Sequence, residues 1–252
     1  MKKKGMLLAG ALMASAVSAD TTLVYNNAKG KELTVMHLSD GVIKMVNQEG
    51  RDTSEMLFRG DDGSFTVVMH NERQYMVFGP KEIEMLSDVS AMIDAMLDKQ
   101  LANMPEGQRA QARAMMEGMV KSRLPKQAPV PDYHKTSNSR DVNGYSCDVV
   151  EKVTKGKKDS DDFCVADYGE LGISAVEYSA ISGMMKVAEK LASQFGNDSS
   201  MNFEQIGEVV PVQYDMNGIK ASLVKVSHDD LGAQMFQVPA GYEKQSIPEI
   251  GL

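Results

Sequence analysis

Hydrophobic and polar residues alternate in short runs through residues 20–78. Six such runs follow one another, and turn-forming Gly, Asn and Asp residues separate them. In order, they are TTLVYNN, ELTVMHL, GVIKMVNQ, SEMLFRG, SFTVVMH and RQYMVFG. Short alternating runs between turns are typical of antiparallel strands. We therefore predict an antiparallel meander here, and its partly apolar faces on both sides favour a curved sheet that is covered on its concave side.

The pattern changes to a helical period at Pro80. Apolar residues such as Ile93, Leu97 and Leu101 recur at three- and four-residue spacing, with a Pro-Glu-Gly break in the middle of the region,. A proline in a first turn and a break between two periodic runs are typical of two successive helices. The sequence therefore predicts a helical hairpin, inserted at about residues 80–124 between two β regions.

The rest of the chain returns to strands around one further helix. A proline-rich linker at 125–133 precedes a β-hairpin that carries both cysteines, and a helix is predicted over residues 175–196,. The runs VVPVQYD and IKASLVKVS flank an Asn-Gly pair, which is a strong hairpin signal,. A third strand is predicted for AQMFQVP, and the final EKQSIPEIGL is expected to be a loose tail. We expect these elements to form a single α+β domain over residues 20–252.

The two cysteines, Cys147 and Cys164, are expected to form a disulfide bond. They lie in predicted strands on either side of the turn-rich KGKKDS. If Lys155 and Gly156 form a two-residue turn, Cys147 faces Cys164 directly across the hairpin. A bond that closes so short a loop stabilises a fold by about 3 kcal/mol. The alternative is a redox-active pair, although no C-x-x-C motif is present,.

The N-terminal residues have the features of an export signal. Three lysines, an apolar run from Met6 to Val17 and a Val-Ser-Ala ending follow one another,. We predict that residues 1–19 are a cleaved signal peptide and that the protein is periplasmic, and soluble once the peptide is removed. The apolar run is too short to span a bilayer, and no later segment is long and apolar enough to do so,. No integral membrane segment is therefore expected after cleavage.

The charge balance disfavours two classes of partner. Without residues 1–19, the chain carries 24 Lys and Arg against 35 Asp and Glu, which is a formal charge of −11. A surface of this sign repels nucleic acid and anionic lipid head groups. We therefore expect neither as a partner.

Motifs of known catalytic or metal chemistry are absent from the sequence. It contains no G-x-S-x-G, no H-E-x-x-H and no phosphate-binding glycine loop,. The four histidines lie in separate segments, and the acidic KKDSDD lacks the glycine and distal glutamate of a dedicated calcium loop,. We therefore expect no catalytic residue, no metal site and no cofactor, and an enzyme is the least favoured class.

Methionine is the unusual feature of the composition. The chain has 20 methionines, and six of them lie within residues 91–120. Methionine is unbranched and polarisable, so it suits the lining of a pocket for apolar ligands of varied shape. The predicted ligand-binding residues are Met92, Met96, Met115, Met119, Met184 and Met185. Two alternatives remain open: the methionines pack a helical core, or pairs one turn apart bind a soft ion such as Cu(I).

The C-terminal segment resembles that of a known superfamily. A Pro-Val strand, an Asn-Gly turn and a closing F-x-V-P-A-G-Y, together with NGYSCDVVEKV and FCVADYGELGI, resemble an uncharacterised family of exported bacterial proteins. That family is similar to the LolA-like lipoprotein-localisation superfamily. The matching C-terminal residues are Pro211, Val212, Phe236, Val238, Pro239, Gly241 and Tyr242.

The resemblance implies an architecture and a function. The expected α+β fold is an antiparallel, incompletely closed β-barrel covered by a helical hairpin and a further helix, with a cavity that holds acyl chains in the best-known relatives. The expected function is non-enzymatic binding of an apolar ligand in the periplasm: a lipid, an acyl chain or a lipoprotein segment, with a lipoprotein or envelope protein as a further partner. The alternatives are an interaction or sensor protein with a filled core, and a methionine-based copper-binding module.

Overall fold

A computed structural model of the chain describes residues 20–49, 52–123, 129, 131–155, 161–194, 196, 201, 203–216 and 218–246. The predicted signal peptide lies outside the described residues, and so does most of the KGKKDS turn. The mixture of helices and strands agrees with the predicted α+β class.

Twelve strands lie in the described part of the chain and form one sheet. Six come from the predicted meander: β1 (Thr21–Asn27), β2 (Glu32–Ser39), β3 (Val42–Glu49), β4 (Asp52–Arg59), β5 (Phe65–Met69) and β6 (Gln74–Phe78). The others are β7 (Asp132–Val142), β8 (Tyr145–Val153), β9 (Asp161–Asp167), β10 (Val209–Met216), β11 (Ile219–Ser227) and β12 (Glu243–Lys244).

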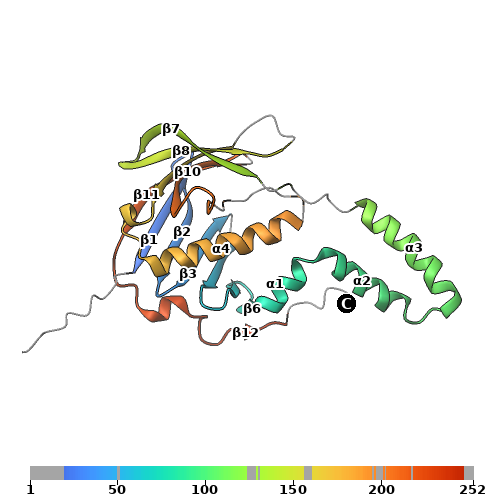
Figure 1. The fold of residues 1–252 in the computed structure, drawn as a ribbon. Coiled ribbons are helices and arrows are strands. Elements are labelled where there is room, and N and C mark those ends of the chain that lie inside the picture. The colour runs from blue at the N-terminus through green and yellow to red at the C-terminus, as the bar shows by residue number, and fades with distance from the viewer. Residues whose placement is uncertain are drawn as a thin grey trace, which may run out of the picture.

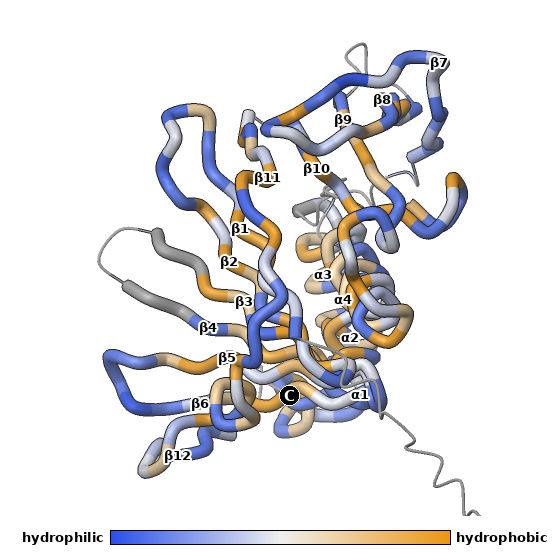
Figure 2. Tube along the Cα trace, turned by 90° about the vertical axis from the view of Figure 1, so that its left-hand side faces the viewer, coloured by the Kyte–Doolittle hydropathy of each residue, from blue (hydrophilic) through white to orange (hydrophobic). Residues whose placement is uncertain are grey.

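The order across the sheet is β12-β6-β5-β4-β3-β2-β1-β11-β10-β9-β8-β7, and Figure 2 labels all of these strands (Figures 1 and 2). Neighbouring strands are antiparallel, except that β12 is parallel to β6. The C-terminal hairpin β10–β11 joins the N-terminal meander through β1. Because β12 and β7 are edges that do not pair with each other, the sheet is open and is not closed into a barrel.

The predicted helical insertion is present, and its first part is divided in two. Its helices are α1 (Pro80–Leu86), α2 (Val89–Leu101) and α3 (Glu106–Arg123), and the later helix is α4 (Ala175–Gln194). The division falls before α2 because the Asp88 carboxylate accepts a hydrogen bond from the Ala91 amide at 2.9 Å and starts a new helix,. Among the described residues, no helix has the length and apolar character needed to cross a membrane.

The hairpin of α2 and α3 extends away from the sheet (Figure 1). Its two helices pack on each other through buried Ile93 and Leu97 on α2 and half-buried Met116 and Val120 on α3. The apolar residues that predict this hairpin therefore form the contact between α2 and α3. The helix that packs on the sheet is α4.

Helix α4 crosses the face of the N-terminal strands (Figures 1 and 2). A capping box fixes its start: the Ser174 amide donates to the Glu177 carboxylate at 2.8 Å, and the Glu177 amide donates to Ser174 Oγ at 3.3 Å,. The same carboxylate accepts a 3.2 Å hydrogen bond from the buried Thr21 hydroxyl on β1. A Cβ added to Gly60 would lie 3.1 Å from the Ala180 Cβ, so glycine permits this close approach. The first turns of α4 are thus anchored to the sheet, above the main core.

The C-terminal segment differs from its prediction at two points. The predicted strand AQMFQVP is wrong, because Ala233–Phe236 forms a 3-10 turn that buries Phe236. Gly232 precedes it with a φ of 70°, which turns the chain out of an extended path,. The predicted loose tail is also partly wrong, since Glu243 and Lys244 pair with β6.

The disulfide bond between Cys147 and Cys164 is present, with the two Cα atoms 5.3 Å apart. The predicted register is wrong, because Cys164 pairs with Val149 and the two cysteines are therefore diagonal neighbours. The connection between the strands is longer than the two-residue turn of the prediction, since β8 ends at Val153 and β9 begins at Asp161.

Strand β7 is not predicted by the hydrophobic pattern. Of its eleven residues, Tyr133 and Val142 are buried, and the segment between them is mostly polar and exposed. The strand lies at an edge of the sheet beside β8, where polar residues are common because one side of the strand meets solvent,.

Candidate functional site

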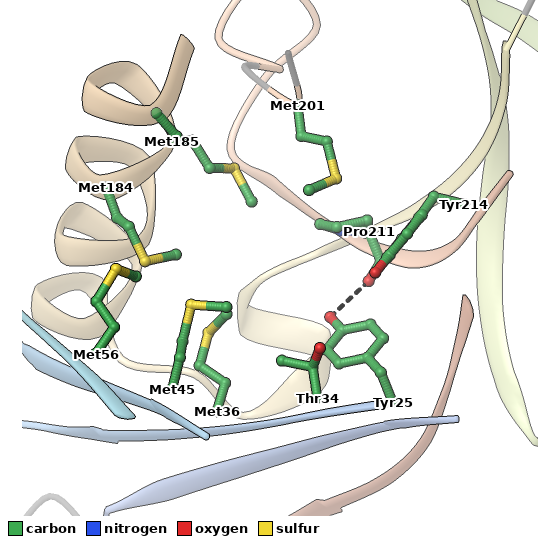
Figure 3. Close-up of a pocket in the computed structure, with 11 residues that line it drawn as sticks. Tyr25, Thr34, Met36, Met45, Met56, Met184, Met185, Met201, Pro211 and Tyr214 are labelled. Carbon is green, nitrogen blue, oxygen red and sulfur yellow. Dashed lines mark hydrogen bonds between the residues drawn. The ribbon is translucent and has the colours of Figure 1, made fainter. Parts of the chain in front are cut away.

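A cavity of about 210 Å³ lies between α4 and the N-terminal strands (Figure 3). It exceeds the volume of about 150 Å³ that holds a benzene molecule and is below the volume of about 300 Å³ at which drug-sized pockets begin. The described residues that line it are Tyr25, Thr34, Met36, Met45, Met56, Met184, Met185, Ala188, Met201, Pro211 and Tyr214. None of these eleven is charged and six are methionines, so the wall is apolar and deformable.

Three strand methionines form the floor of the cavity. Met36 on β2 pairs directly with Met45 on β3, which pairs directly with Met56 on β4. Residues that pair directly across antiparallel strands point to the same face, with Cβ atoms about 5 Å apart. Figure 3 shows the side chains of all three methionines rising into the cavity.

Helix α4 supplies the opposite wall. Ala188 follows Met185 by three residues and Met184 by four, so it shares one side of the helix with both methionines,. The two methionines are half-buried and also pack against the main core. Met201, from the segment after α4, completes this wall and is half-buried as well.

The polar groups of the cavity gather at one end. The Tyr25 hydroxyl donates a 2.7 Å hydrogen bond to the Pro211 carbonyl, and the Tyr25 and Tyr214 ring centroids are 6.3 Å apart. The strand register shifts on both sides of this contact, next to Tyr25 in β1 and between Pro211 and Gln213 in β10. Bulges of this kind redirect side chains, and they often occur next to binding sites.

Both tyrosines remain uncharged at physiological pH. Burial, and then the neighbouring Tyr214, raise the pKa of the Tyr25 hydroxyl well above its ordinary value. Burial also raises the pKa of Tyr214. The cavity therefore presents neutral hydroxyl groups at one end and thioethers over the rest of its wall.

The predicted ligand-binding residues fall in two different places. Met184 and Met185 line the cavity. Met96 is half-buried on α2, whereas Met115 and Met119 on α3 are 63% and 50% exposed. The Met92 side chain lies outside the part of the structure that is described. The structure thus separates the α4 pair from the methionines of the α2–α3 hairpin, whose role as ligand contacts stays a prediction.

The sequence contains a signal for the floor methionines that our prediction does not use. Asp40 and Gly41 have φ angles of 46° and 78°, as the central pair of a two-residue hairpin turn requires,. A two-residue turn at Asp-Gly fixes the register of the flanking strands and places Met36 opposite Met45. The prediction instead follows the density of methionines in the helices.

A second cavity, of about 340 Å³, lies beside the disulfide bond and has a polar wall. Its acidic residues include Asp148, which pairs with Lys135 at 2.6 Å, and the exposed Asp167, Glu170 and Glu208. Among the described residues, no group of three or more His, Cys, Asp or Glu side chains is placed to hold a metal ion. The wall of this second cavity is polar, so the methionine-lined cavity is the candidate site for an apolar ligand.

The fold and the site together define a class of protein: an open antiparallel sheet with one helix over a methionine-lined apolar cavity. The chain belongs to the family described as Domain of unknown function (DUF4412), whose model matches residues 113–242. The match includes the disulfide, α4 and the strands β7 to β11, whereas the three floor methionines lie before it in the sequence.

Solved structures of PNGF-II in two space groups are distantly similar. In space group C2 the identity is 8% over 90% of this chain and 30% of that chain, with a TM-score of 0.41. In space group P21 the identity is 9% over 90% and 32%, with the same TM-score. This chain thus spans about a third of that protein, and a likeness this distant says nothing of function. No curated protein matches the chain. These findings do not show the LolA-like superfamily, and that resemblance stays a prediction.

Proposed function

We propose that the protein is a non-enzymatic periplasmic protein that binds an apolar ligand in the cavity beneath α4. The candidate ligands are a lipid acyl chain and an apolar segment of a lipoprotein. The observation that carries the proposal is the wall chemistry: six thioethers, and no charged side chain among the described lining residues. Water next to such a wall is replaced favourably by an apolar group. The open sheet and the position of α4 above the cavity are compatible with part of the architecture that the resemblance implies, whereas the α2–α3 hairpin extends away from the sheet.

The size of the cavity limits how much of a ligand it encloses. A volume of 210 Å³ holds on the order of eight carbon atoms, by comparison with the six carbons of benzene in about 150 Å³,. Burial of eight methylenes is worth about 6 kcal/mol. Before ordering costs, this corresponds to a dissociation constant in the range of tens of micromolar, and the net affinity is weaker. The cavity therefore suits the end of an acyl chain.

Export is part of this proposal. The lysines and apolar run of residues 1–19 support it, and so does the disulfide bond, because such bonds persist in oxidising compartments,. N-terminal sequencing of the protein from a periplasmic extract tests it. We expect the mature chain to begin at Asp20, and a cytoplasmic protein that retains Met1 would contradict export.

A series of linear alcohols tests the binding function. Isothermal titration calorimetry of the mature protein with 1-hexanol, 1-octanol, 1-decanol and 1-dodecanol measures the affinity gained per methylene. We expect a gain of about fourfold per methylene up to on the order of eight carbons, followed by a plateau. The titrations are run at two temperatures, because apolar burial can have an enthalpy near zero at one of them. Equal affinity for all four alcohols, or no heat of binding for any of them at either temperature, would overturn the proposal.

A charged substitution locates the binding site. Met45→Glu places a carboxylate in the apolar floor, and we expect 1-octanol affinity to fall at least tenfold,. The matched control is Met119→Glu, which makes the same change on the exposed side of α3 and should leave the affinity unchanged. Circular dichroism of both variants checks that the fold is retained. Equal effects of the two substitutions would place the binding outside this cavity.

A further inference from the structure

The six methionines of the cavity have a second chemical capacity beyond apolar lining. They come from two parts of the chain that are far apart in the sequence: the consecutive strands β2, β3 and β4, and α4 with the segment after it. Leucine has about the same volume and packs as well, so packing alone does not require sulfur at six converging positions. What a thioether adds is a soft lone pair, which is a ligand for a soft metal ion.

We propose that this cavity holds a Cu(I) site whose ligands are Met45, Met56 and Met184, with Met36 as a fourth candidate. The register places the three strand methionines next to one another on one face, with Cβ atoms about 5 Å apart between neighbours,. Met184 lies opposite them on α4, and Figure 3 shows these side chains directed toward the same space. Each methionine has three rotatable bonds, so the sulfur atoms can adjust to one ion.

The remaining chemistry of the cavity selects the ion. Hard cations such as Ca²⁺ and Mg²⁺ need several oxygen ligands. The described lining offers the hydroxyl groups of Thr34, Tyr25 and Tyr214 and no carboxylate or imidazole. Cu(II) favours nitrogen and oxygen ligands, whereas thioethers select Cu(I). The low charge of Cu(I) also suits this wall, because neutral ligands leave a single positive charge to be accommodated in an apolar setting.

This site shares the cavity of the proposed function but does not depend on the apolar ligand. Methionine-to-leucine substitutions separate the two, because they keep the apolar volume and remove the sulfur. The test variant is the triple substitution Met45→Leu, Met56→Leu and Met184→Leu. The matched control is Met115→Leu with Met119→Leu on the exposed side of α3.

Anaerobic titration of the mature protein with Cu(I), in competition with a coloured Cu(I) chelator and with ascorbate as the reductant, measures the affinity. We expect one Cu(I) per chain in the wild type and in the α3 control, and at least a hundredfold loss of affinity in the triple variant. Circular dichroism of the triple variant and of the α3 control checks that both keep the wild-type fold.

Two outcomes would overturn the copper site: failure of the wild-type protein to compete with the chelator, or a Cu(I) affinity of the triple variant within a few-fold of the wild type. Failure of the copper site with intact 1-octanol binding leaves the proposed function standing. Copper binding without 1-octanol binding would support the Cu(I) site and overturn the proposed function.

Discussion

Removal of one hydroxyl group, by Tyr25→Phe, tests how the polar end of the cavity is held together. Tyr25 is 5% exposed, and its hydroxyl is 2.7 Å from the carbonyl of Pro211, which is also buried. Phenylalanine keeps the ring and leaves this carbonyl without its donor. Loss of the partner of a buried polar group costs about 1–3 kcal/mol. We therefore expect the free energy of unfolding at pH 7 to fall by that amount.

The pH dependence of the same variant provides a second, independent test. The folded pKa of Tyr25 is raised, so folding favours the protonated hydroxyl. The stabilisation is fully present below the unfolded tyrosine pKa of about 10, and it is lost as the pH rises through the folded pKa. Above pH 10 the wild type should lose about 1.4 kcal/mol per pH unit through Tyr25, and the variant should not. The difference between the two proteins should therefore shrink as the pH rises.

Urea unfolding followed by circular dichroism, at intervals from pH 7 to pH 11, measures both effects. Tyr75→Phe on β6 is the control, because it removes a tyrosine hydroxyl away from the Tyr25–Pro211 contact. The buried Tyr214 is present in every protein compared, so the comparison reports the part of the pH dependence that requires Tyr25. A variant as stable as the wild type at pH 7, or a stability difference that stays constant up to pH 11, would refute the reasoning.

Two further predictions concern the framework around the cavity. Gly60→Ala places a Cβ 3.1 Å from Ala180 and 3.0 Å from a backbone oxygen of the β2–β3 turn, so thermal unfolding should show a loss of about 1–3 kcal/mol,. Gly118→Ala on α3 meets no atom within 4 Å and should instead stabilise by about 0.5–1 kcal/mol; a gain at both sites would contradict the close packing of α4,. Replacement of Cys147 and Cys164 by alanine should cost about 3 kcal/mol in urea unfolding, and reduced wild type should match the variant,. Equal stability of the oxidised protein and the variant would show that the bond contributes nothing.

The sequence predicts the meander well because local signals determine it. Its strands are short alternating runs, and the turn at Asp40 and Gly41 has the residues that a two-residue hairpin needs,. The helices are predicted for the same reason, except at Ser87 and Asp88, where a local cap divides one periodic run. Elements whose signals are local are thus recovered from the sequence.

The failures fall where the structure depends on distant contacts or on the length of a connection. Polar β7 is a strand because β8 lies beside it, and its own pattern is weak. The cysteine register depends on a connection whose length the turn residues do not fix. The prediction of the candidate site is incomplete for the same reason. Met184 and Met185 are among the predicted residues, but Met45 lies beside them only because α4 packs on the sheet.

The position of β1 in the sheet has a consequence for how the chain reaches its native state. This strand is the first element in the described part of the chain, and it pairs with β2 on one side and with β11 on the other. During synthesis, β2 emerges soon after it, but β11 begins at Ile219, close to the end of the chain. Until then, one edge of β1 has bare amide and carbonyl groups that can recruit strands from other molecules. A prematurely terminated chain that lacks β11 should therefore self-associate, and completion of the sheet should be a late and slow event.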